Sequence, residues 1–449
     1  MNPSKKLNAL QHEAATHPGG PLLIAAGAGS GKTHTLVARL THLMEVLHVP
    51  ASRILAITFT NKAAEEMRKR TNASPAMFVG TFHSWGARML RHEATRLGRT
   101  PSFTIFDEDD AGALLKHIAK NRNLPKETCG VPVLSRLVGT IKNEGISARE
   151  AAANGPKALL PDTAEAVWND YETALRQNNA FDFDDLIQKP VELFRTRPDI
   201  LEAYRNKYDH ILIDEYQDIN GVQYELVRML AENHRNLRVV GDDAQSIYAF
   251  RGADFSNFLN FERDGPNAKV IVLEENYRST PVILEAANCI IRNNAVQRTK
   301  NMWTDNPSRG KIGVYAATSD EHEAEWIVKT ILAEMRSGTP LEAIAILYRT
   351  NAQSRALEQA LIACGIPYRI FGGIRFYERK EIKDIMAGLR LAANPSDTVS
   401  AERLMKNFSK GKAVGLIESL PRLGGAKTAS EIIEHFVSST NYLDYLKNN

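Results

Sequence analysis

A glycine-rich stretch near the N-terminus carries residues that can hold a phosphate group. Residues 22–25 form a short apolar run, residues 26–33 read Ala-Gly-Ala-Gly-Ser-Gly-Lys-Thr, and an amphipathic run follows at 36–47. Glycine N–H groups can surround phosphate oxygens, a lysine can reach the terminal phosphates, and a threonine hydroxyl can bind Mg²⁺. The order of strand, loop and helix therefore predicts a nucleotide phosphate site at Lys32 and Thr33.

Two adjacent carboxylates complete this chemistry further along the chain. Residues 210–213 are an apolar run of strand length, and they end in Asp214 and Glu215. In a fold with a phosphate loop, an acid at the end of a core strand meets the metal held by the loop threonine. We therefore expect Asp214 to bind Mg²⁺ and Glu215 to orient and deprotonate the attacking water. Without the upstream loop, the same pair would be interpreted as the polar end of a strand.

Alternating strands and helices are expected to position these residues. Further buried strands are predicted at residues 54–60, 77–82, 237–242 and 269–273, and a helix at 61–70. Strands that alternate with helices favour a parallel, doubly wound sheet. Its ligands are expected at the carboxyl ends of the strands.

A helical insertion interrupts this pattern from about residue 84 to residue 207. Helical periodicity dominates there, as at residues 111–121 and 164–177. Near the end of the insertion, residues 181–186 read Phe-Asp-Phe-Asp-Asp-Leu. These carboxylates suggest either a metal site or a polar helix N-terminus beside core aromatics, and the second interpretation is favoured.

A second α/β unit follows the first. Strands are predicted at residues 311–315, 344–348 and 368–371, and helices at 320–337 and 352–364. This unit has no second phosphate loop. A partner domain that closes over a nucleotide from the opposite side would have this pattern.

Composition sets the broad class of the protein. A chain of 449 residues, 43% hydrophobic and 24% charged, predicts two to four soluble domains. A net charge of +3 neither requires nor excludes a nucleic-acid partner. The spacing of Cys129, Cys289 and Cys364 favours neither a disulfide framework nor a zinc site. Without a membrane-length apolar run or a signal core, we expect a cytoplasmic protein with no membrane partner.

A series of longer motifs occurs in order along the chain. They are LNALQ (7–11), AGAGSGKT (26–33), ITFTNKAAEEM (57–67), VGTFHSW (79–85), FDFDDL (181–186), IDEYQD (213–218), VVGDDAQSIYAFRGAD (239–254), ENYRST (275–280), ILYRTNAQSR (346–355) and IPYRIFGGIRFYERKEIKD (366–384). The ordered set resembles the UvrD/Rep family of superfamily 1 DNA helicases, and the resemblance covers nearly the whole chain.

The resemblance implies an α/β fold with two RecA-like P-loop domains, each a parallel sheet flanked by helices with a helical inserted subdomain. The first domain would take residues 1–88 and 207–277, and its insertion 89–206. The second, incomplete domain would take residues 278–380, with the start of its insertion at 381–449. Such proteins hydrolyse ATP with Mg²⁺ between the domains and move 3′ to 5′ on single-stranded DNA. The implied partners are single strands and duplex/single-strand junctions in repair or replication, with a protein loading partner left open.

The resemblance also assigns residues to roles. Gln11 would contact the adenine edge, Tyr277 would stack on the ring, Gln245 would sense the γ-phosphate and Arg278 would stabilise transition-state charge. The implied catalytic residues are Lys32, Asp214, Glu215, Gln245 and Arg278, and the metal ligands are Thr33 and Asp214. The implied nucleotide contacts are Gln11, Ala26, Gly27, Ala28, Gly29, Ser30, Gly31, Lys32, Thr33, His34, Tyr277 and Arg278.

The implied DNA contacts combine aromatic rings with basic and amide groups. They are Phe59, Thr60, Asn61, Phe82, His83, Tyr248, Phe250, Arg251, Arg349 and Asn351. Aromatic rings stack on any base and basic groups follow the phosphates, so this set predicts grip without sequence preference. Taken singly, Phe59 and Phe82 fit a core role better, because each lies beside an apolar strand.

The chain departs from the family pattern at several positions. Ala26 stands in place of the first loop glycine, His34 of an arginine, Ala244 of an acid and Phe250 of a tryptophan. After Asp397 there is no counterpart of the family's Lys-Gly-Leu-Glu and Thr-Arg-Ala motifs. From this we expect a C-terminally truncated chain whose second sheet has exposed apolar edges.

Three functions remain open from the sequence. The first is an ATP-dependent 3′ to 5′ DNA helicase, and the second is a truncated, hydrolysis-deficient, ATP-gated protein that binds single-stranded DNA. The third is an unrelated P-loop enzyme such as a small-molecule kinase, in which the Gln-Ser-Ile-Tyr and Asn-Tyr-Arg segments would have no role. ATP turnover stimulated by single strands favours the first, and ATP-dependent binding without turnover favours the second.

Overall fold

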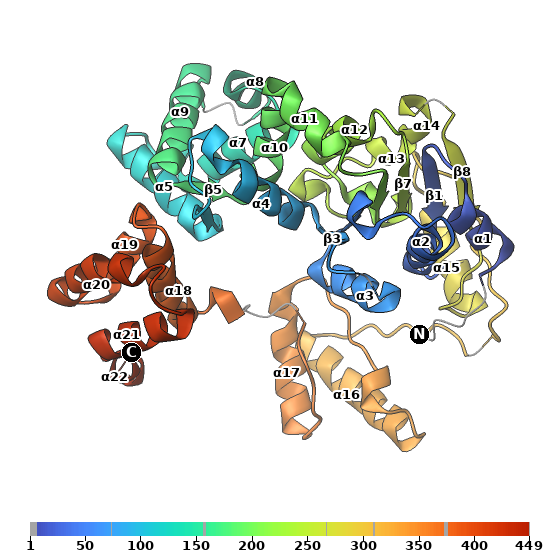
Figure 1. Cartoon of the computed structure of the whole chain (residues 1–449). Helices are drawn as coiled ribbons and strands as arrows, with labels where there is room; N and C mark the ends of the chain where they lie inside the picture. The colour runs from blue at the N-terminus through green and yellow to red at the C-terminus, as the bar shows by residue number, and fades with distance from the viewer. Residues whose placement is uncertain are drawn as a thin grey trace. The chain divides into compact units, whose positions relative to one another are not determined.

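The computed structural model describes residues 7–72, 74–155, 159–265, 267–308, 310–371 and 376–448. The chain divides into two compact units (Figure 1). The first contains residues 1–309 and 390–428, and the second contains residues 310–389 and 429–449.

The first unit is built on a parallel six-stranded sheet. Its strands are β1 (Leu22–Ala26), β2 (Ile54–Thr58), β3 (Phe78–Thr81), β6 (His210–Ile213), β7 (Leu237–Gly241) and β8 (Lys269–Leu273). They lie in the order β3-β2-β6-β7-β1-β8, and every pair is parallel. All residues of β1, β2, β6 and β7 are buried, as expected for a sheet covered on both faces. The predicted parallel α/β fold is confirmed.

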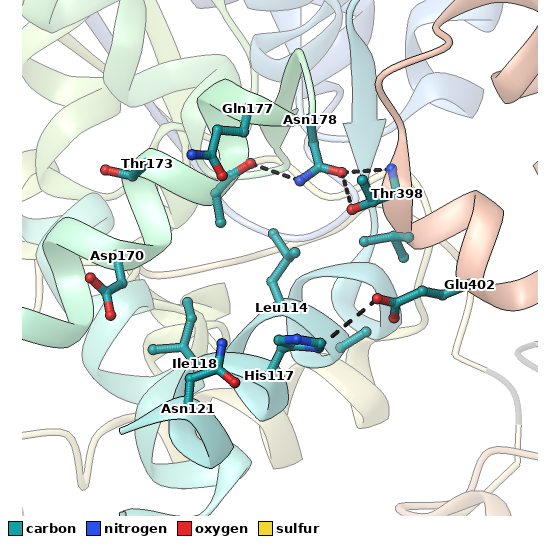
Figure 2. A pocket seen from close by; sticks show the side chains of 13 residues that line it. Leu114, His117, Ile118, Asn121, Asp170, Thr173, Gln177, Asn178, Thr398 and Glu402 are labelled. Carbon is teal, nitrogen blue, oxygen red and sulfur yellow. Dashed lines mark hydrogen bonds and ion pairs between the residues drawn. The ribbon is translucent and has the colours of Figure 1, made fainter. Parts of the chain in front are cut away.

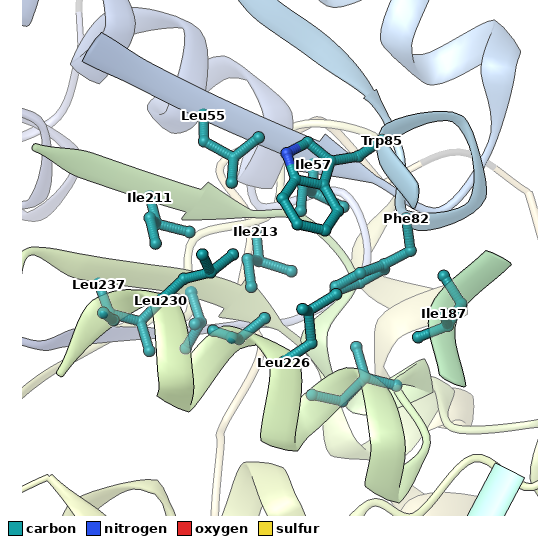
Figure 3. Close-up of a cluster of buried hydrophobic side chains, with 14 of the residues drawn as sticks. Leu55, Ile57, Phe82, Trp85, Ile187, Ile211, Ile213, Leu226, Leu230 and Leu237 are labelled. Carbon is teal, nitrogen blue, oxygen red and sulfur yellow. The ribbon is translucent and has the colours of Figure 1, made fainter. Parts of the chain in front are cut away.

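Helices cover both faces of this sheet. On one face, α2 (Lys32–Thr41) and α3 (Asn61–Thr71) pack on alternate strand residues such as Ile24 and Val240. On the other face, α4 (Phe82–Glu93), α10 (Asp185–Thr196) and α12 (Gly221–Ala231) pack on the intervening residues. Figure 3 shows Phe82, Trp85 and Leu226 around Ile57 and Ile213 in this second core.

The insertion is mostly helical, as predicted. It contains α5 (Glu108–Asn121), α6 (Lys126–Cys129), α7 (Val131–Glu144), α8 (Ala148–Ala153) and α9 (Pro161–Gln177). It also contains a two-stranded parallel sheet of β4 (Thr104–Phe106) and β5 (Ala180–Asp182), which the sequence analysis missed. Strands of this length are too short to show a period of two.

Further helices complete the first unit. They are α1 (Ala9–Thr16), α11 (Pro198–Arg205), α13 (Ser256–Leu259), α14 (Phe261–Asp264), α15 (Pro281–Ile291), α19 (Thr398–Asn407) and α20 (Lys410–Leu423). The domain boundaries expected from the sequence stay predictions.

The second unit contains α16 (Asp320–Arg336), α17 (Ser354–Ala363), α21 (Ala429–Thr440) and α22 (Tyr442–Asn448), and α18 (Lys380–Ala393) runs across the boundary of the units. The strands predicted at 311–315, 344–348 and 368–371 are wrong, because the structure assigns no strand to these segments. Ile344 and Ile346 of the second segment pack against α16 and α17, and Tyr315 of the first stacks on Trp326 of α16. Val314 and Leu347 are 92% and 93% exposed. A strand needs a neighbouring strand for its backbone hydrogen bonds, and these segments are not paired within the described residues.

Within the described residues, no helix combines the length and the apolar character needed to cross a bilayer.

Candidate functional site

The glycine-rich loop joins the carboxyl end of β1 to the start of α2. Gly29 and Gly31 have φ angles of +73° and +88°, a region that favours glycine. A Cβ on Gly29 would lie 2.6 Å from Asn276 Nδ2, and one on Gly31 would lie 2.7 Å from Gln11 Nε2. Both backbone conformation and close neighbours therefore require glycine at these two positions.

Ala26 departs from the sequence pattern without cost to the loop. It is the last residue of β1, fully buried and paired with Leu273 of β8. An extended strand backbone accepts any side chain, so a glycine is unnecessary there. The loop begins only at Gly27, whose carbonyl accepts a hydrogen bond from Ser30 Oγ at 2.8 Å.

The predicted acids follow β6, which is separated from β1 by β7, and they meet the loop at the same end of the sheet. Thr33 Oγ1 donates to Asp214 Oδ2 over 3.5 Å, and Lys32 Nζ lies 3.2 Å from Glu215 Oε2. Burial, followed by the nearby charge of Glu215, raises the pKa of Asp214 to about 7. The structure thus brings together all four residues that the sequence analysis assigned to phosphate, metal and base chemistry.

This pair of oxygens fits a divalent cation. Mg²⁺ prefers hydroxyl and carboxylate oxygens, which Thr33 and Asp214 supply. The buried carboxylate of Asp214 is penalised by desolvation, and a cation would relieve that penalty. No separate group of three or more His, Cys, Asp or Glu side chains arranged to bind a metal occurs in the described parts of the chain.

Glu215 has an unusual backbone. Its φ angle is +53°, a left-handed conformation that costs a non-glycine residue roughly 1–2 kcal/mol. Its backbone N–H donates to Asp214 Oδ1 at 3.1 Å, which helps to hold the turn. Such outliers persist where the surrounding structure fixes them, and they often occur at functional sites.

Gln217, which sequence analysis missed, connects Glu215 to the next loop. Its Nε2 donates to Glu215 Oε2 at 3.0 Å, and its Oε1 accepts from the backbone N–H of Asp242 at 2.9 Å. Gln245 Nε2 in turn donates to Asp242 Oδ2 at 2.7 Å. A chain of hydrogen bonds thus joins Gln245 to the acid beside the phosphate loop. The IDEYQD motif contained Gln217, but sequence alone could not show where its amide points.

The residues expected around the nucleotide base lie on the other side of the loop. Gln11 is buried, and its Nε2 donates to the carbonyl of Ser30 at 2.9 Å. Asn8, which caps α1, donates from Nδ2 to Tyr277 Oη at 2.9 Å, and the backbone N–H of Tyr277 donates to the carbonyl of Gly29 at 3.0 Å. Gln11 and Tyr277 are therefore both tied to the loop.

Arg278 and His34 lie beside the same loop. The Arg278 side chain is exposed, and its Cβ lies within 2.8 Å of the position that a Cβ on Gly29 would take. His34 is half-buried in the first turn of α2.

Aromatic rings gather where two loops of the first unit meet. The ring centroids of Phe59 and Tyr248 are 4.7 Å apart, and those of Tyr248 and Phe250 are 6.0 Å apart. Phe250 is 76% exposed and Phe59 is 37% exposed. Exposed aromatic rings in a cluster offer flat faces to a planar ligand, which matches the DNA contact predicted for these residues. Beside them, the side chain of Thr60 caps α3, which begins at the exposed Asn61.

A second aromatic pair contains His83, which was predicted to contact DNA, and Phe183, which was not. His83 stacks on Phe183, with ring centroids 4.0 Å apart, and Phe183 is 53% exposed. Burial lowers the pKa of His83 to about 4, so its ring is neutral at physiological pH. The sequence analysis treated Phe183 as a core aromatic, and its exposure and its stacking on His83 show that it is not in the core.

Four further expected DNA contacts lie outside these aromatic groups. Phe82 is 6% exposed and packs in the core, so its ring cannot offer a face to a base, and the core interpretation is favoured. The side chain of Arg251 lies outside those that the structure describes. Arg349 and Asn351 are exposed residues of the second unit.

Two carboxylates of the FDFDDL motif, Asp182 and Asp185, are paired with one buried lysine. Lys142 is fully buried, and its Nζ lies 2.6 Å from Asp182 Oδ2, 2.8 Å from Asp185 Oδ1 and 3.5 Å from Glu172 Oε1. Asp182 and Asp185 also accept hydrogen bonds from each other's backbone N–H. The lysine takes the place that a metal would need, so the motif is an internal ion cluster at a helix start.

A pocket of about 320 Å³ lies apart from these sites, between α5, α9 and α19 (Figure 2). At its rim, Asn178 Oδ1 accepts hydrogen bonds from the backbone N–H and the hydroxyl of Thr398, at 2.8 and 2.7 Å. None of the residues expected to bind nucleotide, metal or DNA lines it.

Comparisons with known proteins give a consistent result. Residues 7–266 match the UvrD/REP helicase N-terminal domain, and residues 271–444 match the UvrD-like helicase C-terminal domain. The chain is 43% identical over 421 residues to the ATP-dependent DNA helicase PcrA of Staphylococcus epidermidis, covering 93% of this chain and 58% of that protein. It is 42% identical over 419 residues to PcrA of Staphylococcus aureus, covering 92% and 57%. The chain thus spans less than two thirds of the length of these relatives.

Proposed function

The chain belongs to the UvrD/REP helicase family, and on that basis we propose that it is an ATP-dependent DNA helicase that moves 3′ to 5′ along single-stranded DNA. The observation that carries this proposal is the meeting of Lys32, Thr33, Asp214 and Glu215 at the carboxyl ends of β1 and β6. The PcrA relatives are named as ATP-dependent DNA helicases, which supports the same activity.

The phosphate loop suggests how ATP is held. Lys32 starts α2, where the helix N-terminus adds positive potential, so its Nζ is suited to the β and γ phosphates. Thr33 and Asp214 would hold Mg²⁺, which would neutralise charge on the phosphate oxygens. Lys32 must exchange its contact with Glu215 for the phosphates, and this exchange would free Glu215 to accept a proton from water.

The hydrogen-bond chain through Gln217 suggests how hydrolysis is sensed. This chain links Glu215 to Asp242 and Gln245. A structural change at the γ-phosphate would therefore be transmitted to the loop that leads to Tyr248. Arg278, exposed beside Gly29, is proposed to stabilise transition-state charge.

Two aromatic groups supply the proposed DNA contact. The first is Phe59, Tyr248 and Phe250, and the second is the stacked pair of His83 and Phe183. Bases stack on aromatic faces whatever their identity, so binding should not depend on sequence. Action at duplex/single-strand junctions in repair or replication, a protein loading partner and a cytoplasmic location stay predictions.

Steady-state ATP hydrolysis by the purified chain, with and without a long oligo(dT), tests the proposal. Strong stimulation by the oligonucleotide supports an ATP-driven motor, and unwinding of 3′-tailed but not 5′-tailed duplexes supports its direction. Measurable ATP binding without turnover would instead favour an ATP-gated protein that binds single-stranded DNA.

Replacing Glu215 with glutamine should slow ATP turnover by about 100-fold, the lower end of what a positioned general base contributes. ATP binding should persist, because Lys32 and the glycine loop remain and one anionic competitor for Lys32 is removed. Single-turnover hydrolysis and nucleotide binding, measured on the same preparation, check both parts. A variant that has lost ATP binding would contradict the role of Glu215 as a base.

Replacing Tyr248 and Phe250 together with alanine should weaken binding of oligo(dT) by about 100-fold, since base–aromatic stacking contributes about 1–3 kcal/mol per base. The concentration of DNA that gives half-maximal ATPase stimulation should rise in parallel. Leu160→Ala, an exposed apolar truncation in the insertion, is the matched control and should change neither quantity. Unchanged affinity in the double variant would remove these rings from the DNA contact.

A further inference from the structure

Two arginines are buried in the first unit, at the end of the sheet where β1 and β7 begin, and the phosphate loop lies at the other end. Arg39 lies in α2 and Arg238 is the second residue of β7, and each is 1% exposed. Arg238 is level with Leu22, the first residue of β1, and with Leu212 of β6. The phosphate loop follows the carboxyl end of β1, so the two places are separate.

Each guanidinium makes one hydrogen bond to the end of α1. Arg39 Nη1 donates to the carbonyl of Ala15 at 3.0 Å, and Arg238 Nη2 donates to the carbonyl of His17 at 3.1 Å. These bonds satisfy carbonyls at a helix C-terminus, which is a structural role. A guanidinium group can donate several hydrogen bonds, so these two bonds leave most of the N–H donors of the two arginines unused.

The remaining nitrogens of both side chains lack partners. Arg39 Nε and Nη2 and Arg238 Nε and Nη1 are buried without a hydrogen-bond acceptor among the described residues. The Nδ1 atoms of His17 and His210 are buried and unpartnered in the same way. The two arginines bind carbonyls two residues apart, on Ala15 and His17, and the charges of both lower the pKa of the two imidazoles, so the four side chains lie within electrostatic range of one another.

No described carboxylate forms an ion pair with either arginine. Asp209 is paired with Arg53, and Glu13 lies 3.1 Å from Lys269. Burial lowers the pKa of Arg39 to about 10 and that of Arg238 to about 9, so both remain charged at neutral pH. Burial, followed by the charge of the arginines, lowers the pKa of both His17 and His210, so the imidazoles add no charge there.

A buried, uncompensated charge is costly, and two adjacent ones are more so. Water could accept the free N–H groups, but it would leave the charge uncompensated. An oxyanion would accept these hydrogen bonds and also neutralise the charge. Guanidinium N–H groups match the oxygens of phosphate or carboxylate, and a neutral imidazole can donate one further hydrogen bond. We propose that Arg39 and Arg238, with His17 and His210, form an internal binding site for a small oxyanion such as phosphate.

Equilibrium dialysis with radiolabelled phosphate tests this site in a Lys32→Ala background, where the phosphate loop is disabled. About one phosphate per chain is expected, and adding Arg238→Met should abolish binding. Absence of bound phosphate in the Lys32→Ala chain, together with no stabilisation by acetate in the next assay, would overturn the proposal. Because the phosphate loop is inactive in this background, the result does not depend on the proposed ATP-driven function.

Thermal unfolding at constant ionic strength gives a second test. At about 100 times its Kd, phosphate should raise the unfolding midpoint by roughly 5 °C relative to chloride. Arg39→Met and Arg238→Met should lose this response, and Arg53→Met should keep it, because Arg53 belongs to a half-exposed ion pair with Asp209. A larger effect of acetate than of phosphate would identify a carboxylate as the natural occupant. An equal response in Arg238→Met and Arg53→Met would show a general salt effect and contradict the site.

Discussion

Replacing Lys32 with alanine is expected to lower DNA-stimulated ATP turnover by roughly 10³-fold, the lower end of what a cationic side chain facing the transferred phosphate contributes. Lys32 Nζ is the amine that the structure places beside Glu215 at the start of α2. The substitution removes a positive charge from beside the phosphate oxygens on which negative charge is redistributed during cleavage. Turnover should fall far more than affinity for single-stranded DNA measured without nucleotide.

The fold should survive this substitution. Alanine is the best helix former, and Lys32 occupies the first position of α2. Glu215, which loses its partner, is 32% exposed at its side chain and can be solvated. Unchanged circular dichroism and an unfolding midpoint close to that of the unmodified chain would confirm this.

Steady-state hydrolysis with saturating oligo(dT) is the measurement, and Lys69→Ala is the matched control. Lys69 is an exposed lysine that pairs with Glu65 one helical turn away, so its removal should leave turnover unchanged. Normal turnover in Lys32→Ala would refute the assignment of the phosphate loop, whatever the fate of the DNA contacts.

The parts of the site that sequence could predict are those coded by local pattern. The apolar run before Gly27 and the run before Asp214 each had to be a buried strand, and parallel strands place their carboxyl ends together. The contact of Thr33 with Asp214 and of Lys32 with Glu215 follows from that arrangement. Their meeting needed no knowledge of side-chain packing.

Other features depend on contacts between distant segments. Phe183 reads as a core aromatic until its stacking on His83 is seen, and the amide of Gln217 could point anywhere in the absence of Asp242. The strand predicted at 237–242 contains Arg238, and nothing in its pattern indicates that this arginine is buried against the end of α1. In each case the partner lies far away in sequence, and no periodicity records it.

The three strands predicted wrongly in the second unit are an error of a different kind, because here the local pattern was present and the expected structure was not. Residues 311–315, 344–348 and 368–371 have the apolar pattern of strands, and Ile344 and Ile346 of the second segment pack on helices. A pattern cannot supply the backbone partner that a strand requires. Local sequence therefore predicted the helices α16 and α17, whose hydrogen bonds lie within each segment, but not the hydrogen bonding of these three segments.

Replacing Lys142 with methionine is expected to destabilise the insertion by about 3–5 kcal/mol, the cost of leaving buried charges without their partner. Burial lowers the pKa of Lys142, but the carboxylates of Asp182, Asp185 and Glu172 outweigh burial and raise it. Burial likewise raises the pKa of Asp182, and the charge of Lys142 outweighs burial and lowers it. The charges of Lys142 and Asp182 are therefore each tolerated because of the other, whereas burial, followed by the charge of Asp182, raises the pKa of Asp185 to about 7.

The loss of stability caused by Lys142→Met should depend on pH. Because the pKa of Asp182 is lowered in the folded chain, its contribution to stability is present above its unfolded pKa and is lost as pH falls through the folded one. In Lys142→Met this contribution is absent, and the buried carboxylates can become neutral by taking up protons. The difference in stability between the two chains should therefore be smaller at pH 5 than at pH 8.

Hydrogen exchange of α7 and α9, which carry Lys142 and Glu172, measures the effect locally. Lys69→Met is the control, and its surface pair should change protection by less than about 0.5 kcal/mol. Adding Asp182→Asn to Lys142→Met should restore part of the protection, because one fewer carboxylate is left unpaired. Since Asp182 and Asp185 flank Phe183, the single variant should also loosen its stacking on His83 and weaken binding of single strands. Protection equal to that of the unmodified chain at pH 8 would mean that water or another cation reaches the carboxylates, and the cluster would then not be the element that fixes this turn.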